Sequence, residues 1–260
     1  MSSNHHVMVY PPDKLLFFKL TNHNELHHGF QYTTGLNIDS LQFNPTGECS
    51  SGGLYFFDET QLKHFFLYTT NIVYIREVTF PVDAKIYCEI DKYKCDKFIL
   101  GERKRFYLDD HFSNEEVFEI IQQYGGGEVL KYVKEQTEEI CLAAVKVNGL
   151  ALKYVKVQTE EICLAAVQEY GRALESVKEQ TSEICLAAVQ RYGWALEFVK
   201  VQTPEICLAA VQQHRRALQY VKEQTPEICM AAVQQNGGAL CHVKVQTDLL
   251  CLAAFLELSQ

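Results

Sequence analysis

The chain has 260 residues, of which 47% are hydrophobic and 22% charged, and its formal net charge is −9 at pH 7. This composition excludes a disordered or collagen-like chain, and the acidic balance argues against a broad basic surface that binds phosphate backbones. No stretch approaches the roughly 18 consecutive apolar residues of a membrane-spanning helix, and the N-terminus lacks a secretory signal pattern. We therefore expect a soluble intracellular protein that binds neither nucleic acid nor membranes.

The first part of the chain is predicted to be an α+β module. Aromatic and β-branched residues, punctuated by Gly and Pro, indicate strands at residues 17–20, 53–57, 72–80 and 85–90. Residues 58–66 begin with two acidic residues, which suit the positive end of a helix dipole, and are predicted to be helical. We assign residues 1–12 to a flexible N-terminus and residues 13–110 to the module.

From Ser113 onward the sequence repeats itself every 22 residues. Six copies of the pattern Thr-x-Glu-Ile-Cys-Leu-Ala-Ala-Val-Gln, the last one degenerate, begin at Thr137, Thr159, Thr181, Thr203, Thr225 and Thr247. An incomplete and degenerate copy of the repeat precedes them at residues 113–133. In each copy Thr is a predicted N-cap, and the acidic residue in the first turn suits the helix dipole. Such a period is typical of stacked repeat architectures.

Each copy is predicted to contain two short helices. In the second copy the first helix is expected to end at Tyr170, with Gly171 in the left-handed conformation that commonly ends helices. Apolar residues at helical spacing after Gly171 predict a second helix. Because residues 162–167 are apolar nearly all round, only neighbouring copies can cover the first helix. We therefore predict that residues 113–260 form an all-α solenoid of 22-residue helical hairpins, with a degenerate N-terminal unit.

Some copies depart from this pattern. Arg215 replaces the glycine that follows the first helix elsewhere, and a non-glycine residue costs about 1 kcal/mol in the left-handed region, so we expect local strain or an altered turn. The last copy, residues 247–256, lacks a second helix and is predicted to be a C-terminal capping helix. Its apolar side either packs back on the array, which we favour, or is the place where another molecule docks. The residue two places before each Thr alternates between Glu and Val, which indicates a true repeat of 44 residues.

Six of the ten cysteines belong to the repeat and recur 22 residues apart. Each lies in an apolar run, where a free thiol packs as a small core residue. Stacked helices lie about 8–10 Å apart, which exceeds the ~7 Å limit on the Cα separation of a disulfide. We expect these thiols to be buried and reduced, in a reducing compartment.

Several short motifs of the module carry a family resemblance: Phe18-Lys19-Leu20-Thr21-Asn22, His27-His28-Gly29-Phe30, Gly52-Gly53-Leu54-Tyr55-Phe56, Ile75-Arg76-Glu77-Val78 and Ile99-Leu100-Gly101. They resemble the N-terminal module of many mimivirus-type giant-virus proteins, where it precedes ankyrin or other repeats. The 22-residue units are similar to short helical repeats of uncharacterised function in those viruses and in some bacteria. The resemblance implies a giant-virus origin and action in the host cytoplasm, and it implies no activity.

A second resemblance concerns the order of residues in the module. His28-Gly29, followed by Gly53-Leu54-Tyr55 and then a strand, is similar to the early part of ADP-ribosyltransferases. That resemblance implies an enzyme that uses NAD, in which His28 holds the nicotinamide ribose, Tyr55 stacks on nicotinamide and Glu102 activates the acceptor. The interval from His28 to Tyr55 is short for that family, and Glu102 stands in no clear family motif. Structural roles in a small sheet are the favoured interpretation, so no cofactor is expected.

Cysteines and histidines of the module hold enough donor atoms for zinc: Cys49, Cys88, Cys95, His23, His27 and His28. They show no Cys-x-x-Cys pair, which zinc sites often have, and the histidines could equally belong to a loop. We therefore predict no metal site.

The repeat copies differ most around the end of the first helix. Aromatic residues and arginines gather there: Tyr170, Arg172, Tyr192, Trp194, His214 and Arg216. Trp, Tyr and Arg dominate the hot spots of protein interfaces, although turn positions also vary where nothing restrains them. Our hypothesis is a non-catalytic adaptor that binds a host or viral protein through this edge. The alternative is an ADP-ribosyltransferase-like enzyme whose repeat array selects the substrate.

Overall fold

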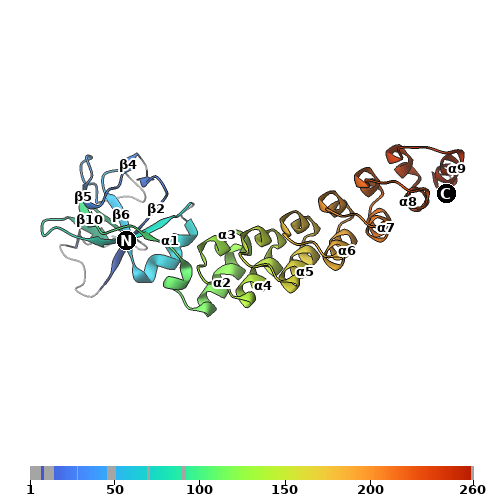
Figure 1. The fold of residues 1–260 in the computed structure, drawn as a ribbon. Helices are drawn as coiled ribbons and strands as arrows, with labels where there is room; N and C mark the ends of the chain where they lie inside the picture. The colour runs from blue at the N-terminus through green and yellow to red at the C-terminus, as the bar shows by residue number, and fades with distance from the viewer. Residues whose placement is uncertain are drawn as a thin grey trace, which may run out of the picture. The chain divides into compact units, whose positions relative to one another are not determined.

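The structure is a computed structural model, and it describes residues 7–8, 15–27, 29–45, 51–68, 71–88 and 92–258. The chain divides into two compact units, Met1–Phe106 and Tyr107–Gln260. Figure 1 shows strands in the first unit and stacked helices in the second. The expectation of a sheet-rich region followed by a run of helices is confirmed.

Within the described residues, the first unit contains a nine-stranded sheet in the order β1-β8-β9-β6-β2-β7-β10-β5, and β11 also pairs with β7. All of these pairs are antiparallel, and β3 and β4 form a separate antiparallel pair. The strands are β1 (Val7–Met8), β2 (Phe17–Thr21), β3 (Leu26–His27), β4 (Phe30–Gln31), β5 (Gly35–Ile38), β6 (Leu54–Asp58), β7 (Tyr74–Thr79), β8 (Ile86–Cys88), β9 (Tyr93–Cys95), β10 (Lys97–Leu100) and β11 (Lys104–Arg105). β1 lies within the segment expected to be flexible, and it pairs with β8.

Strand β6 runs directly into a capped helical turn. Asp58, its last residue, accepts hydrogen bonds from the backbone N–H groups of Thr60 and Gln61, and the Gln61 side chain accepts from the Asp58 N–H. This capping box starts the 3-10 helix η1 (Glu59–Gln61), which α1 (Leu62–Tyr68) continues. The helix expected at 58–66 is therefore present, but Asp58 itself belongs to the strand and acts as the cap.

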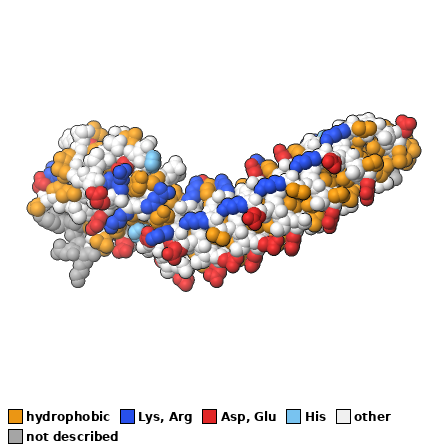
Figure 2. All heavy atoms as spheres, in the orientation of Figure 1, with side chains coloured by type: hydrophobic (Ala, Val, Ile, Leu, Met, Phe, Trp, Pro, Cys, Tyr) orange, Lys and Arg blue, Asp and Glu red, His pale blue; other side chains and the backbone are white. Residues whose placement is uncertain are grey.

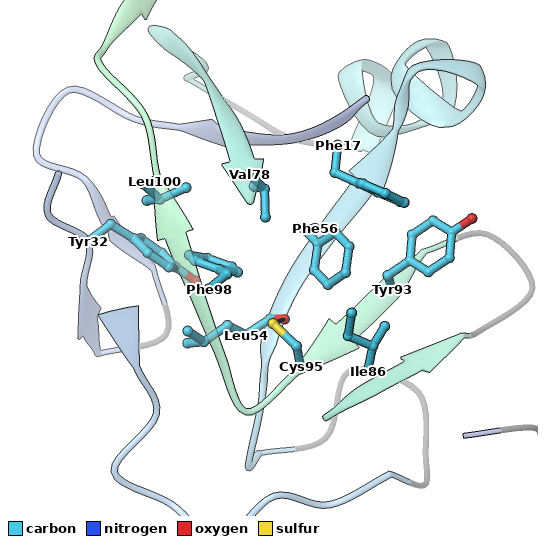
Figure 3. Close-up of a cluster of buried hydrophobic side chains, with 10 residues drawn as sticks. All are labelled: Phe17, Tyr32, Leu54, Phe56, Val78, Ile86, Tyr93, Cys95, Phe98 and Leu100. Carbon is cyan, nitrogen blue, oxygen red and sulfur yellow. Dashed lines mark hydrogen bonds between the residues drawn. The ribbon is translucent and has the colours of Figure 1, made fainter. Parts of the chain in front are cut away.

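Aromatic side chains fill the interior of the sheet (Figure 3). Phe56 and Phe98 are fully buried, and the Phe56 ring stacks on Tyr93 with 5.3 Å between centroids. Phe56 also meets Phe98 edge-on at 6.3 Å. β6 and β10 carry these two rings and are separated in the sheet by β2 and β7. The sheet therefore curls around a common core.

A buried ion pair ties three parts of this sheet together. The Arg76 side chain on β7 is fully buried, and its Nη1 donates to Glu25 Oε1 at 2.8 Å. Its Nη2 donates to Thr34 Oγ1 at 2.6 Å, and both Nε and Nη2 donate to the Gly101 carbonyl oxygen. Glu25 has a left-handed backbone, with φ of 53°. Arg76 thus joins β7, the turn before β3 and the loop after β10.

The second unit is a run of helical units, each of which packs on the next (Figure 1). It begins with η2 (Leu108–Asp110), α2 (Asn114–Tyr124), α3 (Gly126–Val129) and η3 (Leu130–Tyr132). The regular units each combine an α-helix with a 3-10 helix: α4 (Glu138–Val147) and η4 (Gly149–Tyr154), α5 (Glu160–Glu169) and η5 (Gly171–Ser176), α6 (Ser182–Arg191) and η6 (Gly193–Phe198), α7 (Pro204–Gln213) and η7 (Arg215–Tyr220), α8 (Pro226–Gln235) and η8 (Gly237–His242). α9 (Asp248–Leu258) follows.

The second helix of each unit is a 3-10 helix, which the apolar spacing did not predict. In η5 the backbone N–H of Ala173 donates to Tyr170 O at 2.8 Å, and that of Val177 donates to Leu174 O at 3.2 Å. These are bonds between residues three apart. The backbone is extended at Tyr170 and at Val177, so only six residues lie between them. Short segments of this length are where 3-10 helices occur.

The predicted helix starts and the predicted burial are confirmed. Thr159 caps α5 by accepting a hydrogen bond from the Ile162 N–H at 3.3 Å, and Pro204 occupies the first turn of α7. Ile162 and Cys163 are buried, as are the alanine and valine that follow them on the same helix. The same four positions are buried in α4, α6, α7 and α8. Neighbouring units therefore cover these helices.

The glycine after each α-helix has a different role from the one expected. Gly171 does not lie in the left-handed region, and the helix ends because Tyr170 is extended, with φ of −146° and ψ of 106°. A Cβ at Gly171 would lie 2.8 Å from both the Ala188 carbonyl oxygen and Tyr192 Cβ. The glycine is needed because two units approach closely at this point.

The strain or altered turn expected at Arg215 is not found. His214, which precedes it, is extended like Tyr170, with φ of −151° and ψ of 118°, and η7 has the same length as its neighbours. Arg215 has no positive φ, so the reason for expecting strain does not apply. Its side chain is exposed, and Nη1 donates to Asn236 Oδ1 at 3.2 Å.

Gly149, Gly171 and Gly193 leave no room for a Cβ atom beside the next unit. A Cβ at Gly149 would lie 2.4 Å from the Ala166 carbonyl oxygen, so Gly149→Ala is expected to lower the free energy of unfolding by about 1–3 kcal/mol. Urea denaturation followed by far-UV circular dichroism measures this change. Arg215→Ala is the matched control, because a Cβ is already accommodated at that position. Equal shifts in the two variants would contradict close approach as the explanation.

Glutamines 22 residues apart link consecutive 3-10 helices. Gln180 Nε2 donates to the carbonyl oxygen of Leu174 in its own unit and to that of Phe198 in the next, at 3.3 and 2.9 Å. Its Oε1 accepts from the Lys200 N–H at 2.9 Å and from Cys185 Sγ at 3.8 Å. Equivalent bridges are formed by Gln136, Gln158, Gln202 and Gln224. We call this set the glutamine ladder.

The last helix corrects two expectations. Leu249 and Phe255 on α9 are 65% and 67% exposed, so the apolar side of this helix does not pack back on the array. Cys251, expected to be buried like the other repeat cysteines, is exposed. The side of an α-helix that faces the following unit stays uncovered here because α9 is the last helix among residues 92–258.

Five repeat cysteines match the expected free, buried thiols: Cys141, Cys163, Cys185, Cys207 and Cys229. Burial raises the pKa of the Cys163 thiol, as it does at the other four positions. A raised pKa lowers the thiolate fraction and therefore the reactivity of these groups. None of the helices in the described ranges is both long enough and apolar enough to cross a membrane.

Candidate functional site

The aromatic residues expected at the partner-binding edge form one contiguous row. Tyr170, Tyr192 and His214 each end an α-helix, and Trp194 is the second residue of η6. The centroids of the Tyr170 and Tyr192 rings are 6.5 Å apart, and those of Tyr192 and Trp194 are 5.6 Å apart. Trp194 meets His214 edge-on at 5.0 Å. Units that stack with a 22-residue period therefore bring these rings into contact.

A hydrogen bond fixes the centre of this row. Trp194 Nε1 donates to His214 Nδ1 at 2.7 Å, and the Arg216 backbone N–H donates to the same nitrogen at 3.1 Å. Burial lowers the pKa of His214, and the nearby charges of Arg216 and Arg215 lower it further. A neutral imidazole with an unprotonated Nδ1 is the acceptor that these two donors require. The row is therefore preorganised in the folded array.

Two of the residues expected at this edge are arginines. Arg172 is exposed; its guanidinium lies 5.6 Å from the centroid of the Phe198 ring, and its Nε donates to Glu175 Oε2 at 3.3 Å. Arg216 is exposed beside Trp194 and His214. The Tyr170 and Tyr192 side chains are 41% and 42% exposed. We call the six residues Tyr170, Arg172, Tyr192, Trp194, His214 and Arg216 the aromatic row.

Figure 2 shows a second regular feature, basic side chains at even intervals along the array. Lysines 22 residues apart donate from Nζ to the carbonyl oxygen of the lysine one unit earlier, at 2.7–3.0 Å: Lys156 to Lys134, Lys178 to Lys156, Lys200 to Lys178, Lys222 to Lys200 and Lys244 to Lys222. These bonds link consecutive units, which gives the lysines a role in the array itself. Sequence reasoning missed them and the glutamine ladder.

The residues of the enzyme alternative, His28, Tyr55 and Glu102, all belong to the first unit. His28 lies outside the described residues. Tyr55 lies on β6, where the ammonium groups of Lys92 and Lys94 are 5.4 and 5.2 Å from its ring centroid. Glu102 is exposed in the loop after β10. In the order of the sheet, β2 and β7 lie between β6, which carries Tyr55, and β10, which precedes Glu102.

The metal-binding candidates likewise form no ligand set in the part of the chain that the structure describes. No three His, Cys, Asp or Glu side chains within those ranges are placed to hold a metal ion. Cys49 and His28 lie outside the described residues. Cys95 belongs to the aromatic core of the first unit, and burial raises the pKa of its thiol.

The fold and the aromatic row define a helical-repeat protein with a sheet-rich N-terminal unit. Residues 137–181 and 181–224 each match the family described as Domain of unknown function (DUF4116). Each match begins at a helix-capping Thr and spans two of the 22-residue units, which agrees with the 44-residue repeat indicated by the Glu and Val alternation. No solved structure matches the chain.

The similar proteins come from Acanthamoeba polyphaga mimivirus. The chain is 41% identical over 96 residues to "Putative ankyrin repeat protein R868", covering 34% of this chain and 46% of that protein. It is 37% identical over 101 residues to "Uncharacterized protein R869", covering 36% of this chain and 70% of that protein. A third match, to "Putative ankyrin repeat protein R229", has 32% identity over 104 residues and covers 34% of this chain and 33% of that protein.

These matches establish the family. The chain belongs to the family of mimivirus proteins that includes R869. The resemblance to giant-virus proteins that combine an N-terminal module with repeats is confirmed. The chain spans about half the length of the first of these relatives and a third of R229.

Proposed function

We propose that this protein is a non-catalytic adaptor whose repeat array binds a protein partner through the aromatic row. Three of the similar mimivirus proteins carry names that describe them as ankyrin repeat proteins, which supports an interaction role. We also propose that the stacked units constitute a solenoid, since each α-helix packs on the next and the residues between them are buried. In solenoids of this kind an extended surface performs the binding.

The observation that carries the proposal is the contact of partly exposed aromatic rings, from Tyr170 to His214, across three consecutive units. Tyr170, Tyr192 and Trp194 present rigid amphipathic surfaces, and their mutual contacts restrict the rotamers before any partner arrives. Preorganised aromatic groups lose little entropy on binding. Arg172 and Arg216 add charged donors at the margin of the same surface. This combination of residue types is typical of interface hot spots.

The proposed place of action is the host cytoplasm. The relatives belong to a virus of amoebae, and the buried cysteines of the repeat are free thiols with raised pKa values. Buried free thiols suit a reducing compartment. The partner would then be a host or viral protein of that compartment.

The test is a pull-down from lysate of infected amoebae, followed by affinity measurement with the partner it identifies. The double variant Trp194→Ala and Arg216→Ala is expected to bind the partner at least ~30-fold more weakly, which corresponds to the loss of one or two hot-spot residues. Circular dichroism is expected to show an intact array, because these side chains lie at its surface. Tyr124→Ala is the control, since Tyr124 is 44% exposed on α2, outside the row. Unchanged affinity of the double variant for every recovered partner would refute the proposal.

A further inference from the structure

His214 occupies a position that the other regular units fill with asparagine or tyrosine. It is the C-terminal cap of α7, as Asn148 and Asn236 are the caps of α4 and α8. The Oδ1 atom of each asparagine accepts a hydrogen bond from the backbone N–H two residues later, at 3.0 and 2.9 Å. His214 Nδ1 accepts in the same way from the Arg216 N–H at 3.1 Å. In this unit a nitrogen that can be protonated therefore replaces an amide oxygen that cannot.

The same nitrogen holds the indole ring of the preceding unit. Trp194 Nε1 donates to His214 Nδ1 at 2.7 Å, and the two rings meet edge-on with 5.0 Å between centroids. The centroid of the Tyr192 ring lies 5.6 Å from that of Trp194. Among the described residues, His214 Nδ1 is the acceptor of the indole N–H. The orientation of Trp194 therefore depends on this hydrogen bond and on contacts with two neighbouring rings.

Two donors converge on Nδ1 of His214, so this atom must keep a free lone pair. A neutral imidazole whose proton is on Nε2 provides that lone pair, whereas protonation adds a hydrogen to Nδ1. The new N–H group would then face two other N–H donors, Trp194 Nε1 and the Arg216 backbone. Neither hydrogen bond can form between two donors. Protonation of His214 therefore leaves the Trp194 indole without its acceptor.

The surroundings of His214 favour its neutral form. Burial lowers the pKa of His214, and the charges of Arg216 and Arg215 on η7 lower it further. Because the pKa lies below its ordinary value of 6.5, both hydrogen bonds are complete above that pH and are lost as the pH falls through the lowered pKa. The other titratable groups on α6, α7, α8 and the 3-10 helices beside them form no ion pair with His214 within residues 92–258: Glu183, Arg191, Tyr192, Glu197, Glu205, Tyr220, Glu227 and His242.

We propose that His214 is the positioning residue of the aromatic row and that protonation of its Nδ1 releases the Trp194 indole. The consequence for binding rests on the function proposed above: a partner held by the row is bound more weakly in acid. Loss of the hydrogen bond that orients one hot-spot residue corresponds to about 3- to 10-fold weaker binding. The change stays local, because Tyr170 and Tyr192 cap their helices without any side-chain hydrogen bond.

Nuclear magnetic resonance of the whole 260-residue chain tests the release directly, because Trp194 is the only tryptophan and its indole N–H gives a single resonance. In the wild type this resonance is expected to move from a hydrogen-bonded chemical shift toward that of free tryptophan between about pH 7.5 and about pH 5. His214→Asn is expected to keep it in place, because Oδ1 accepts hydrogen bonds at this position in α4 and α8. His214→Tyr, the residue found at the same position in α5 and α6, is expected to show the free shift at both pH values.

Circular dichroism is expected to be the same for the wild type and both variants, which separates release of the indole from unfolding. A wild-type resonance that stays in place down to about pH 5, or that moves equally in His214→Asn, would overturn the proposal.

Affinity for the protein recovered in the pull-down described above tests the consequence for binding. The wild type is expected to bind it about 3- to 10-fold more weakly at the lower pH, and His214→Asn equally at both. Equal weakening in the two proteins would overturn the pH control while leaving the aromatic row as the binding surface. If the double variant Trp194→Ala and Arg216→Ala kept its full affinity, the proposed function would fail, and the indole resonance would still decide whether His214 positions Trp194.

Discussion

Arg76→Met is expected to lower the free energy of unfolding of the first unit by about 3–5 kcal/mol. This is the typical cost of removing one partner of a buried ion pair, because the charge of the other partner is then buried without compensation. The variant leaves the carboxylate of Glu25, a residue that is 8% exposed, without the guanidinium that lies 2.8 Å away. It also removes the donors that reach the Gly101 carbonyl oxygen. The loss is measured by urea denaturation followed by near-ultraviolet circular dichroism of the tyrosines.

A second substitution separates the lost ion pair from lost packing. Arg76→Met combined with Glu25→Gln is expected to be less destabilised than Arg76→Met alone, because no uncompensated charge is then buried. Lys97→Ala serves as the control, since it removes an ion pair to an Asp83 side chain that is 76% exposed, and only a small shift of the midpoint is expected. If Arg76→Met unfolded at the wild-type urea concentration, the structural role assigned to Arg76 would be wrong.

Gln180→Ala is expected to destabilise the array by about 2–6 kcal/mol, because one side chain makes four hydrogen bonds and each contributes about 0.5–1.5 kcal/mol. The carbonyl oxygens of Leu174 and Phe198 and the N–H of Lys200 all lose this partner. The substitution weakens the contact between two neighbouring units, because Gln180 connects η5 with η6. Trp194, the only tryptophan, lies on η6 and reports unfolding by its fluorescence.

Gln246 offers the matched control for this prediction. It stands at the same position before a capping Thr, but it is exposed and donates to Leu240 O within its own unit, with no later 3-10 helix among residues 92–258 to bridge. Gln246→Ala is therefore expected to leave the midpoint of unfolding close to that of the wild type. Similar losses in both variants would mean that the glutamine acts through local helix capping and not through the link between units.

Part of the candidate site could be predicted from the sequence alone. Tyr170, Tyr192 and Trp194 stood out because aromatic residues gather where the copies differ. Their contact at ring distances of 5.6–6.5 Å depends on the stacking of units and could not be read from the chain. His214 as acceptor for Trp194 Nε1 is likewise a consequence of two units lying side by side. The binding role of the row stays a prediction.

The amino-acid sequence by itself determined the 22-residue period, the Thr caps that start the α-helices and the burial of residues such as Ile162 and Cys163. These features depend on local propensity and on the periodic burial of apolar side chains, which neighbouring residues in the chain already encode. Only the tertiary structure decided that the second helix is of the 3-10 type, that Gly171 serves close approach, and that Gln180 bridges two units. The roles of Gly171 and Gln180 depend on distances between backbones about 20 residues apart, which exist only once the units have packed. The 3-10 type of the second helix follows from the six residues between two extended positions.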